Sequence, residues 1–150
     1  MSERAPTSAE RIAEFATSLA FEDIPDEVVQ TTKLHVLDAI GCGLAAHALD
    51  VAVEGRATMA ELGSGDATVI GLDTPLPAPH AAFANAMLCH GLDYDDTHSD
   101  SVCHITVAVV PAVTAVSTSS PERPSDSATA SAAGTTATVM WHTESEWVSS

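Results

Sequence analysis

The chain has 150 residues, of which 45% are hydrophobic, and 21 acidic against 5 basic residues give it a formal net charge of −16. This length and composition fit one globular domain with an apolar core, and they exclude a disordered or fibrous protein. The negative charge excludes nucleic-acid and anionic-membrane partners, because such a surface repels phosphate groups.

A first helix is predicted from residue 7 onward. Thr7 and Glu10 have the spacing of a capping box, in which each side chain binds the other residue's main-chain N–H. Apolar residues then recur at intervals of three and four, at Ile12, Phe15, Ala16 and Leu19. This periodicity predicts one buried helical face.

A long second helix is predicted to begin at Pro25 and Asp26. Its helical period is kept by Val29, Val36, Leu37, Ile40 and Leu44. Gly41 and Gly43 lie in its later turns, where each glycine costs about 1 kcal/mol against alanine, which indicates close approach of a packed neighbour. The G-x-G pattern follows a helix and not a strand, so it does not predict a nucleotide loop.

A third helix is predicted from Asp50 to Leu62, with Gly63 as its stop. Residues 67–70 are apolar and β-branched, and they predict a brief strand or an extended connector. Three prolines, Pro75, Pro77 and Pro79, exclude helix before His80. A fourth helix is then predicted from Ala81 to Leu92.

A fifth helix is predicted from His104 to Val116, although its valines favour strand and Pro111 would kink it. The uncharged run 101–121 has the length of a membrane span, but histidine, proline and hydroxyl residues interrupt it, so we interpret it as a buried helix. Residues 1–117 thus predict one all-α helical bundle. Residues 118–150 are rich in Ser, Thr, Ala, Gly and Pro and predict a disordered tail.

The N-terminus lacks the apolar segment of a secretory signal, and Cys42, Cys89 and Cys103 have neither disulfide nor zinc spacing. We therefore expect a cytoplasmic protein with reduced thiols. So many acidic residues with so few lysines also predict a halophilic protein, because concentrated salt screens the self-repulsion of the fold.

The densest group of polar side chains lies between the fourth and fifth predicted helices. Its members are His90, Asp93, Tyr94, Asp95, Asp96, Thr97, His98, Asp100 and His104. Carboxylates this close cannot all ionise cheaply when desolvated, so at least one is expected to have a raised pKa and to form an acid/base pair with a neighbouring histidine. Thr97 could orient a substrate carboxylate or hydroxyl.

Two other interpretations of this group stay open. It could be a solvated acidic loop that caps the next helix. It could also hold a divalent ion through Asp93, Asp95, Asp96, His98 and Asp100, although the glycine and glutamate of an EF-hand are absent.

Outside the group, Cys89 and Cys103 are interpreted as small core residues. His35, His47, His80 and His142 have no charged partner motif and are interpreted as ordinary histidines.

The string of residues 84–98, ANAMLCHGLDYDDTH, with His104 and Pro111-Ala112, resembles the signature of the MmgE/PrpD family. Residues 34–46 resemble the long second helix of the same family's all-helical N-terminal domain. The resemblance spans residues 9–116 and implies that Asp93, Thr97 and His104 are catalytic, with His90, Asp95 and Asp96 in support.

The resemblance also implies chemistry like that of 2-methylcitrate dehydratase. The family acts on small di- and tricarboxylates without metal or organic cofactor, by removing a proton next to a carboxylate and expelling water or carbon dioxide. It further implies a homodimer.

Family proteins also have a second α+β domain, whose histidine, lysine and arginine residues complete the pocket. Here the basic residues are Arg4, Arg11, Lys33 and Arg56 before the motif and Arg123 after it. These departures predict a truncated chain that is inactive alone. The alternatives are a helical interaction module, which pairs with itself or with a separately encoded remainder, and an acidic metal-binding domain.

Overall fold

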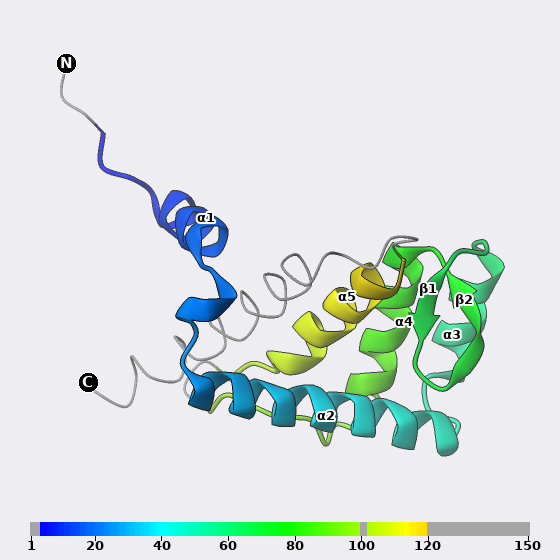
Figure 1. Ribbon diagram of the computed structural model, residues 1–150. Coiled ribbons are helices and arrows are strands. Elements are labelled where there is room, and N and C mark those ends of the chain that lie inside the picture. Colours follow the sequence, from blue (N-terminus) through cyan, green and yellow to red (C-terminus); the bar gives the residue numbers. More distant parts are fainter. Residues whose placement is uncertain (1–3, 100–101, 120–150) are drawn as a thin grey trace.

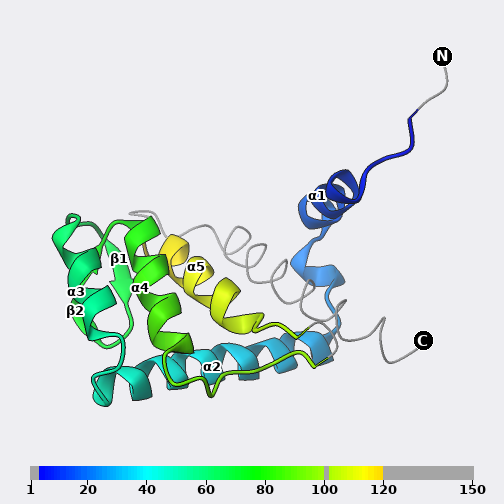
Figure 2. The ribbon, with the colours of Figure 1, turned by 180° about the vertical axis from the view of Figure 1, so that it is seen from behind.

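The structure, a computed structural model, describes residues 4–99 and 102–119. Its elements are α1 (Ser8–Ser18), a 3₁₀ turn (Phe21–Asp23), α2 (Asp26–Ala48), α3 (Val53–Glu61), β1 (Ala67–Val69), β2 (Leu72–Leu76), α4 (Ala78–His90) and α5 (Thr106–Ser119). Within these residues the chain is helical apart from one two-stranded hairpin, which confirms the predicted fold class. Figures 1 and 2 show α4 and α5 side by side against α2, with β1, β2 and α3 at one end.

The core forms where α4 and α5 pack on each other and on β1. Leu88 and Cys89 of α4 are fully buried, as are Ala67 of β1 and Ala115 of α5. Pro111 lies inside α5 and is buried, yet the helix continues to Ser119, three residues beyond the predicted end. The predicted tail, beyond the last two residues of α5, lies outside the described residues.

Side chains from two helices bind the outer edge of β1, whose inner edge pairs antiparallel with β2. The fully buried Asn85 of α4 accepts from Ile70 N–H at 2.8 Å and donates to the Thr68 carbonyl at 3.0 Å. The Thr68 N–H donates to Thr118 Oγ1 of α5 at 2.9 Å. The hairpin is therefore attached to both central helices by hydrogen bonds as well as by apolar contact.

α1 begins as predicted but packs differently. Thr7 and Glu10 form the capping box, with Thr7 N–H to Glu10 Oε2 at 2.7 Å and Glu10 N–H to Thr7 Oγ1 at 3.2 Å. The predicted buried face is wrong, because no residue of α1 is buried and Ile12 is 61% exposed. In Figure 1, α1 extends away from the other helices.

Apart from Val28, the residues that α2 buries are small; of the predicted face, Val29 and Val36 pack partly against the core, but the leucines do not. Leu37 is 67% exposed and Leu44 48%, whereas Ala39, Cys42, Gly43 and Ala46 are buried. A Cβ at Gly43 would lie 3.2 Å from Ile70 Cδ1 and 3.3 Å from Cys89 Sγ. The prediction of close packing is thus confirmed at Gly43. It is wrong at Gly41, where no described atom lies within 4 Å of an added Cβ.

The start of α4 also differs from the prediction. α4 begins at Ala78, with Pro79 in its first turn, so the exclusion of helix before His80 was wrong. A proline needs no main-chain hydrogen bond there.

Among residues 4–99 and 102–119 no single helix is long and apolar enough to cross a membrane. Only α2 and α3 taken together have the necessary length and apolar character, and they are bent by 94° at their junction.

Candidate acid/base site

The loop between α4 and α5 is closed by one antiparallel bridge. His98 and Cys103 pair there, with His98 N–H donating to the Cys103 carbonyl at 3.0 Å. In this register the next facing residues are Thr97 and His104, and Thr97 Oγ1 lies 3.4 Å from His104 Nδ1. His90 ends α4, so the bridge brings two histidines and the acidic run between them to one place.

Asp95 holds both histidines. Its side chain is only 1% exposed; Oδ1 lies 3.1 Å from His90 Nδ1 and Oδ2 lies 2.7 Å from His104 Nδ1. An ionised carboxylate only accepts hydrogen bonds, so each imidazole donates its Nδ1–H. The Nε2 atom of each neutral ring is then left with a free lone pair, which is the form that a general base requires.

The charge on Asp95 is stabilised by these two contacts. Burial by itself would raise the pKa of the Asp95 carboxyl, but the hydrogen bonds from His90 and His104 outweigh it and hold the pKa below the usual 3.8. The buried Asp95 is thus not a carboxylate with a raised pKa, because the loop supplies two hydrogen-bond donors to it.

Asp93 and Thr97 complete the group on its solvent side. Carboxylate or imidazole atoms of His90, Asp93, Asp95 and His104 all lie within 4.8 Å of one another. Asp93 has φ 50°, in the left-handed region that aspartate tolerates better than most residues. The structure therefore brings together the predicted Asp93, Thr97 and His104 with His90 and Asp95. Asp93 and Thr97 remain exposed.

Asp96 takes a separate position. Its Oδ2 accepts from the fully buried Thr106 hydroxyl at 2.5 Å and lies 3.7 Å from His35 Nδ1. Its Oδ1 is buried and accepts no hydrogen bond from the part of the chain that the structure describes. Asp96 thus links the loop to the start of α5 and to α2. His35 was interpreted as an ordinary histidine, because no charged partner motif surrounds it in the sequence.

Other predictions for single residues have mixed outcomes. Cys89 is buried as expected, and burial, helped by Cys42 and the charge of Asp95, raises the pKa of its thiol to about 11. A thiol that stays protonated is a poor nucleophile.

Cys103 is exposed, so its interpretation as a core residue is wrong. His47 is not an ordinary histidine, since it contacts the buried Arg56. Asp100 and His142 lie outside the described residues.

His90, Asp93, Asp95 and His104 are also the described residues that could hold a metal ion. Only Asp93 and Asp95 of this set belong to the metal-site alternative derived from the sequence. Both oxygens of Asp95 already accept hydrogen bonds, so an ion would have to displace two imidazole protons.

Positive charge is scarce around the site. In the part of the chain that the structure describes, the carboxylates of Asp93, Asp95 and Asp96 form ion pairs with histidines alone or with no partner. Arg4 pairs instead with Glu10 at 2.6 Å. Among these residues no lysine or arginine forms an ion pair with the carboxylates of the site.

Comparisons with known proteins agree with the resemblance. A family model described as the MmgE/PrpD N-terminal domain matches residues 10–144. Cis-aconitate decarboxylase of Aspergillus terreus is 33% identical over 107 residues, 71% of this chain and 22% of that protein. The human enzyme of that name is 31% identical over 115 residues, 73% of this chain and 24% of that protein. The matched part spans less than a quarter of these relatives. No solved structure matches significantly.

Proposed function

The chain belongs to the MmgE/PrpD family, and we propose that it carries the acid/base part of a lyase that acts on small di- or tricarboxylates. Its parent chemistry is dehydration of the 2-methylcitrate type or decarboxylation of cis-aconitate. The observation that carries the proposal is the contact of Asp95 with both histidines, beside Asp93 and Thr97.

His104 is the proposed base. Asp95 fixes its Nδ1–H at 2.7 Å, so that Nε2 is available to take a proton from a carbon next to a carboxylate. Asp95 also stabilises the imidazolium that forms. Thr97 and Asp93 can hold the leaving hydroxyl or orient a carboxylic acid by hydrogen bonds. His90 shares Asp95 and is a second proton carrier.

By itself the chain is proposed to be inactive, because a tricarboxylate needs cations that the described residues do not place at the site. The 150-residue chain, incubated with cis-aconitate or 2-methylcitrate in concentrated salt, is expected to give no turnover. Turnover that disappears in Asp93→Asn would contradict inactivity while supporting the chemistry.

A chimaera tests the chemistry directly. The segment of the A. terreus enzyme that matches this chain is replaced by the corresponding residues of this chain, and decarboxylation of cis-aconitate is measured with EDTA present. We expect activity that falls about 100-fold or more in His104→Asn and in Thr97→Val, whereas the exposed control Asp66→Asn keeps it. A folded chimaera whose activity is unchanged by His104→Asn would refute the assignment of His104 as the base.

A second candidate function is helix-mediated association. The outer face of α2 exposes Leu34 and Leu37 at 67% each and Leu44 at 48%, a large apolar surface for a single helix. We propose that a second copy of the chain covers this face. Size-exclusion chromatography with light scattering is expected to show a dimer that Leu37→Glu dissociates; Thr58→Glu on α3 is the control. A folded monomer at high concentration would contradict the dimer.

A further inference from the structure

A cavity lies between α3, β2 and α4, lined by none of the residues of the acid/base site. Its volume is about 310 Å³, within the range of small-molecule sites. Its lining residues are Val53, Arg56, Ala57, Ala60, Leu72, Thr74, Leu76 and Ala84. Apart from the Arg56 guanidinium and the Thr74 hydroxyl, these side chains are aliphatic, and none belongs to the acid/base site.

Arg56 is buried here without an acidic partner. The residue is 8% exposed, and among residues 4–99 and 102–119 no carboxylate forms an ion pair with it. Its Nη1 contacts His47 Nδ1, and its Nε is buried with no hydrogen-bond partner among the described residues. Because a guanidinium stays protonated, His47 must accept through its Nδ1 lone pair as a neutral ring.

The His47 ring is held in place by the hairpin. Gly71, at the turn between β1 and β2, has φ 74°, and a Cβ there would lie 2.6 Å from His47 Cδ2. Packing therefore fixes the ring that binds one end of the guanidinium. On the opposite edge, no described residue forms a hydrogen bond with Nε.

A buried cation without a counter-charge is costly, and a neutral imidazole satisfies one donor without supplying charge. The Nε and Nη2 atoms share one edge of the guanidinium and match the two oxygens of a carboxylate. We infer that this cavity binds a monocarboxylate with a short aliphatic chain, the carboxylate on Arg56 and the chain against the apolar wall. Phosphates and tricarboxylates fit poorly, because the lining offers one cation and one hydroxyl.

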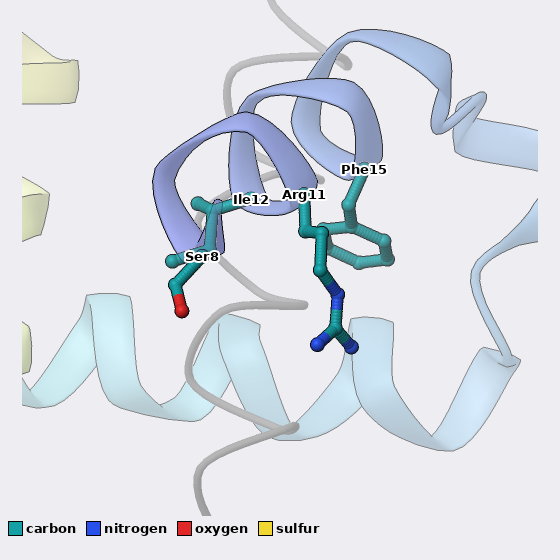
Figure 3. Close-up of a pocket in the computed structure, with 4 residues that line it drawn as sticks. All are labelled: Ser8, Arg11, Ile12 and Phe15. Atoms are coloured by element: carbon teal, nitrogen blue, oxygen red, sulfur yellow. The ribbon is translucent and has the colours of Figure 1, made fainter. Parts of the chain in front are cut away.

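The test measures hexanoate binding to the 150-residue chain, by saturation-transfer NMR and by the midpoint of thermal unfolding at constant ionic strength. Hexanamide is the neutral probe of the same length. Arg56→Met removes the charge and Ala60→Leu narrows the cavity. Arg11→Met is the matched control, because Arg11 also lines a cavity, of about 360 Å³, with Ser8, Ile12 and Phe15 of α1, but is exposed (Figure 3).

Hexanoate is expected to bind saturably and to raise the unfolding midpoint, with hexanamide binding about tenfold or more weakly. Arg56→Met should unfold at the same or a higher temperature without ligand, since an unpaired buried charge is removed, and should weaken hexanoate binding about tenfold or more. Ala60→Leu should weaken it too, while Arg11→Met leaves it unchanged. Equal binding of hexanoate and hexanamide, or undiminished binding by Arg56→Met and Ala60→Leu, would overturn the inference.

Discussion

Asp95 is almost fully buried and yet holds a charge, because each of its carboxylate oxygens lies within hydrogen-bond distance of an imidazole nitrogen. Asp95 therefore helps to hold the loop between α4 and α5, together with Asp96 and the bridge between His98 and Cys103. It also fixes the orientation of His104, the proposed base, relative to the end of α4. The Asp95 carboxylate thus stabilises the loop and orients the proposed base, and experiments can separate these two effects.

Replacing Asp95 by Asn is expected to lower the free energy of unfolding by about 1–3 kcal/mol at pH 7, because a buried hydrogen-bonded charge is lost. The pKa of Asp95 is lowered in the folded state, so its contribution is fully present above the unfolded value, near 3.8. That contribution disappears as the pH falls through the lower folded value. Urea unfolding of both proteins between pH 7 and pH 3 should therefore show a difference in stability that shrinks as the pH falls below about 4.

The exposed Asp66→Asn serves as the control and should change stability by less than about 0.5 kcal/mol. A difference between wild type and Asp95→Asn that stays constant down to pH 3 would show that the lost contacts do not depend on the charge.

The composition of this site was predictable from the sequence, whereas its internal arrangement was not. The crowding of carboxylates and histidines between two apolar segments marks the place. Which carboxylate becomes buried depends on the bridge between His98 and Cys103, a contact that carries no local pattern. For the same reason the separate position of Asp96, beside Thr106 and His35, could not be foreseen.

Among the helices, α2 shows how packing can reverse an expectation from periodicity. Its leucines form a regular helical stripe, but α4 and the hairpin approach the side with the smallest residues. Close backbone contact at Gly43 brings α2 nearer to its neighbours than leucine side chains would allow. Hydrophobic period predicts that a helix has an apolar face, but it does not predict which face its neighbours within the chain cover.

The two glycines of α2 give a matched pair of substitutions. Gly41→Ala should raise the free energy of unfolding by about 1 kcal/mol, because the position is exposed, helical and open around the new Cβ. Gly43→Ala should be less stable than Gly41→Ala, because its Cβ meets Ile70 and Cys89 at 3.2–3.3 Å. Urea unfolding measures both, and equal gains would mean that the contact at Gly43 relaxes without cost.

Asn85 joins α4 to the hairpin, and its two hydrogen bonds can be removed one at a time. Asn85→Asp keeps an acceptor for Ile70 N–H but loses the donor to the Thr68 carbonyl, whereas Asn85→Leu loses both. Both variants should lose about 1–3 kcal/mol or more of the free energy of unfolding, because Asn85→Leu leaves two main-chain groups unpaired and Asn85→Asp buries a charge without a counter-charge. Relative to global unfolding, hydrogen exchange of the Ile70 amide should accelerate more in Asn85→Leu, and equal exchange in the two variants would contradict an acceptor kept by Asp.

The whole folded molecule carries a formal net charge of −16. The all-α class and most of the helices follow from apolar periodicity and capping signals, which act locally and are readable in one sequence. The exposure of α1 does not follow, because burial of a terminal helix depends on contacts with distant residues. The net charge, in contrast, follows from the composition of the complete chain. It supports a prediction about stability in salt without any knowledge of the fold.

Stability is expected to rise with potassium chloride. Screening lengths fall from about 10 Å at 0.1 M to about 3 Å at 1 M, so most of the mutual repulsion of the acidic side chains is removed over that interval. The urea midpoint, followed by circular dichroism, should increase steeply up to about 1 M salt and then level off. A midpoint that does not rise below 1 M would count against the halophilic interpretation.

The side chains on the outer edge of β1 also limit how copies of this protein can meet. A free strand edge invites addition of a strand from another molecule, the first step toward cross-β aggregates. Here the amide of Asn85 and the hydroxyl of Thr118 occupy the main-chain groups that an incoming strand would need. Strand addition at β1 is thereby blocked, and loss of Asn85 would expose the protein to amyloid-like polymerisation as well as to unfolding.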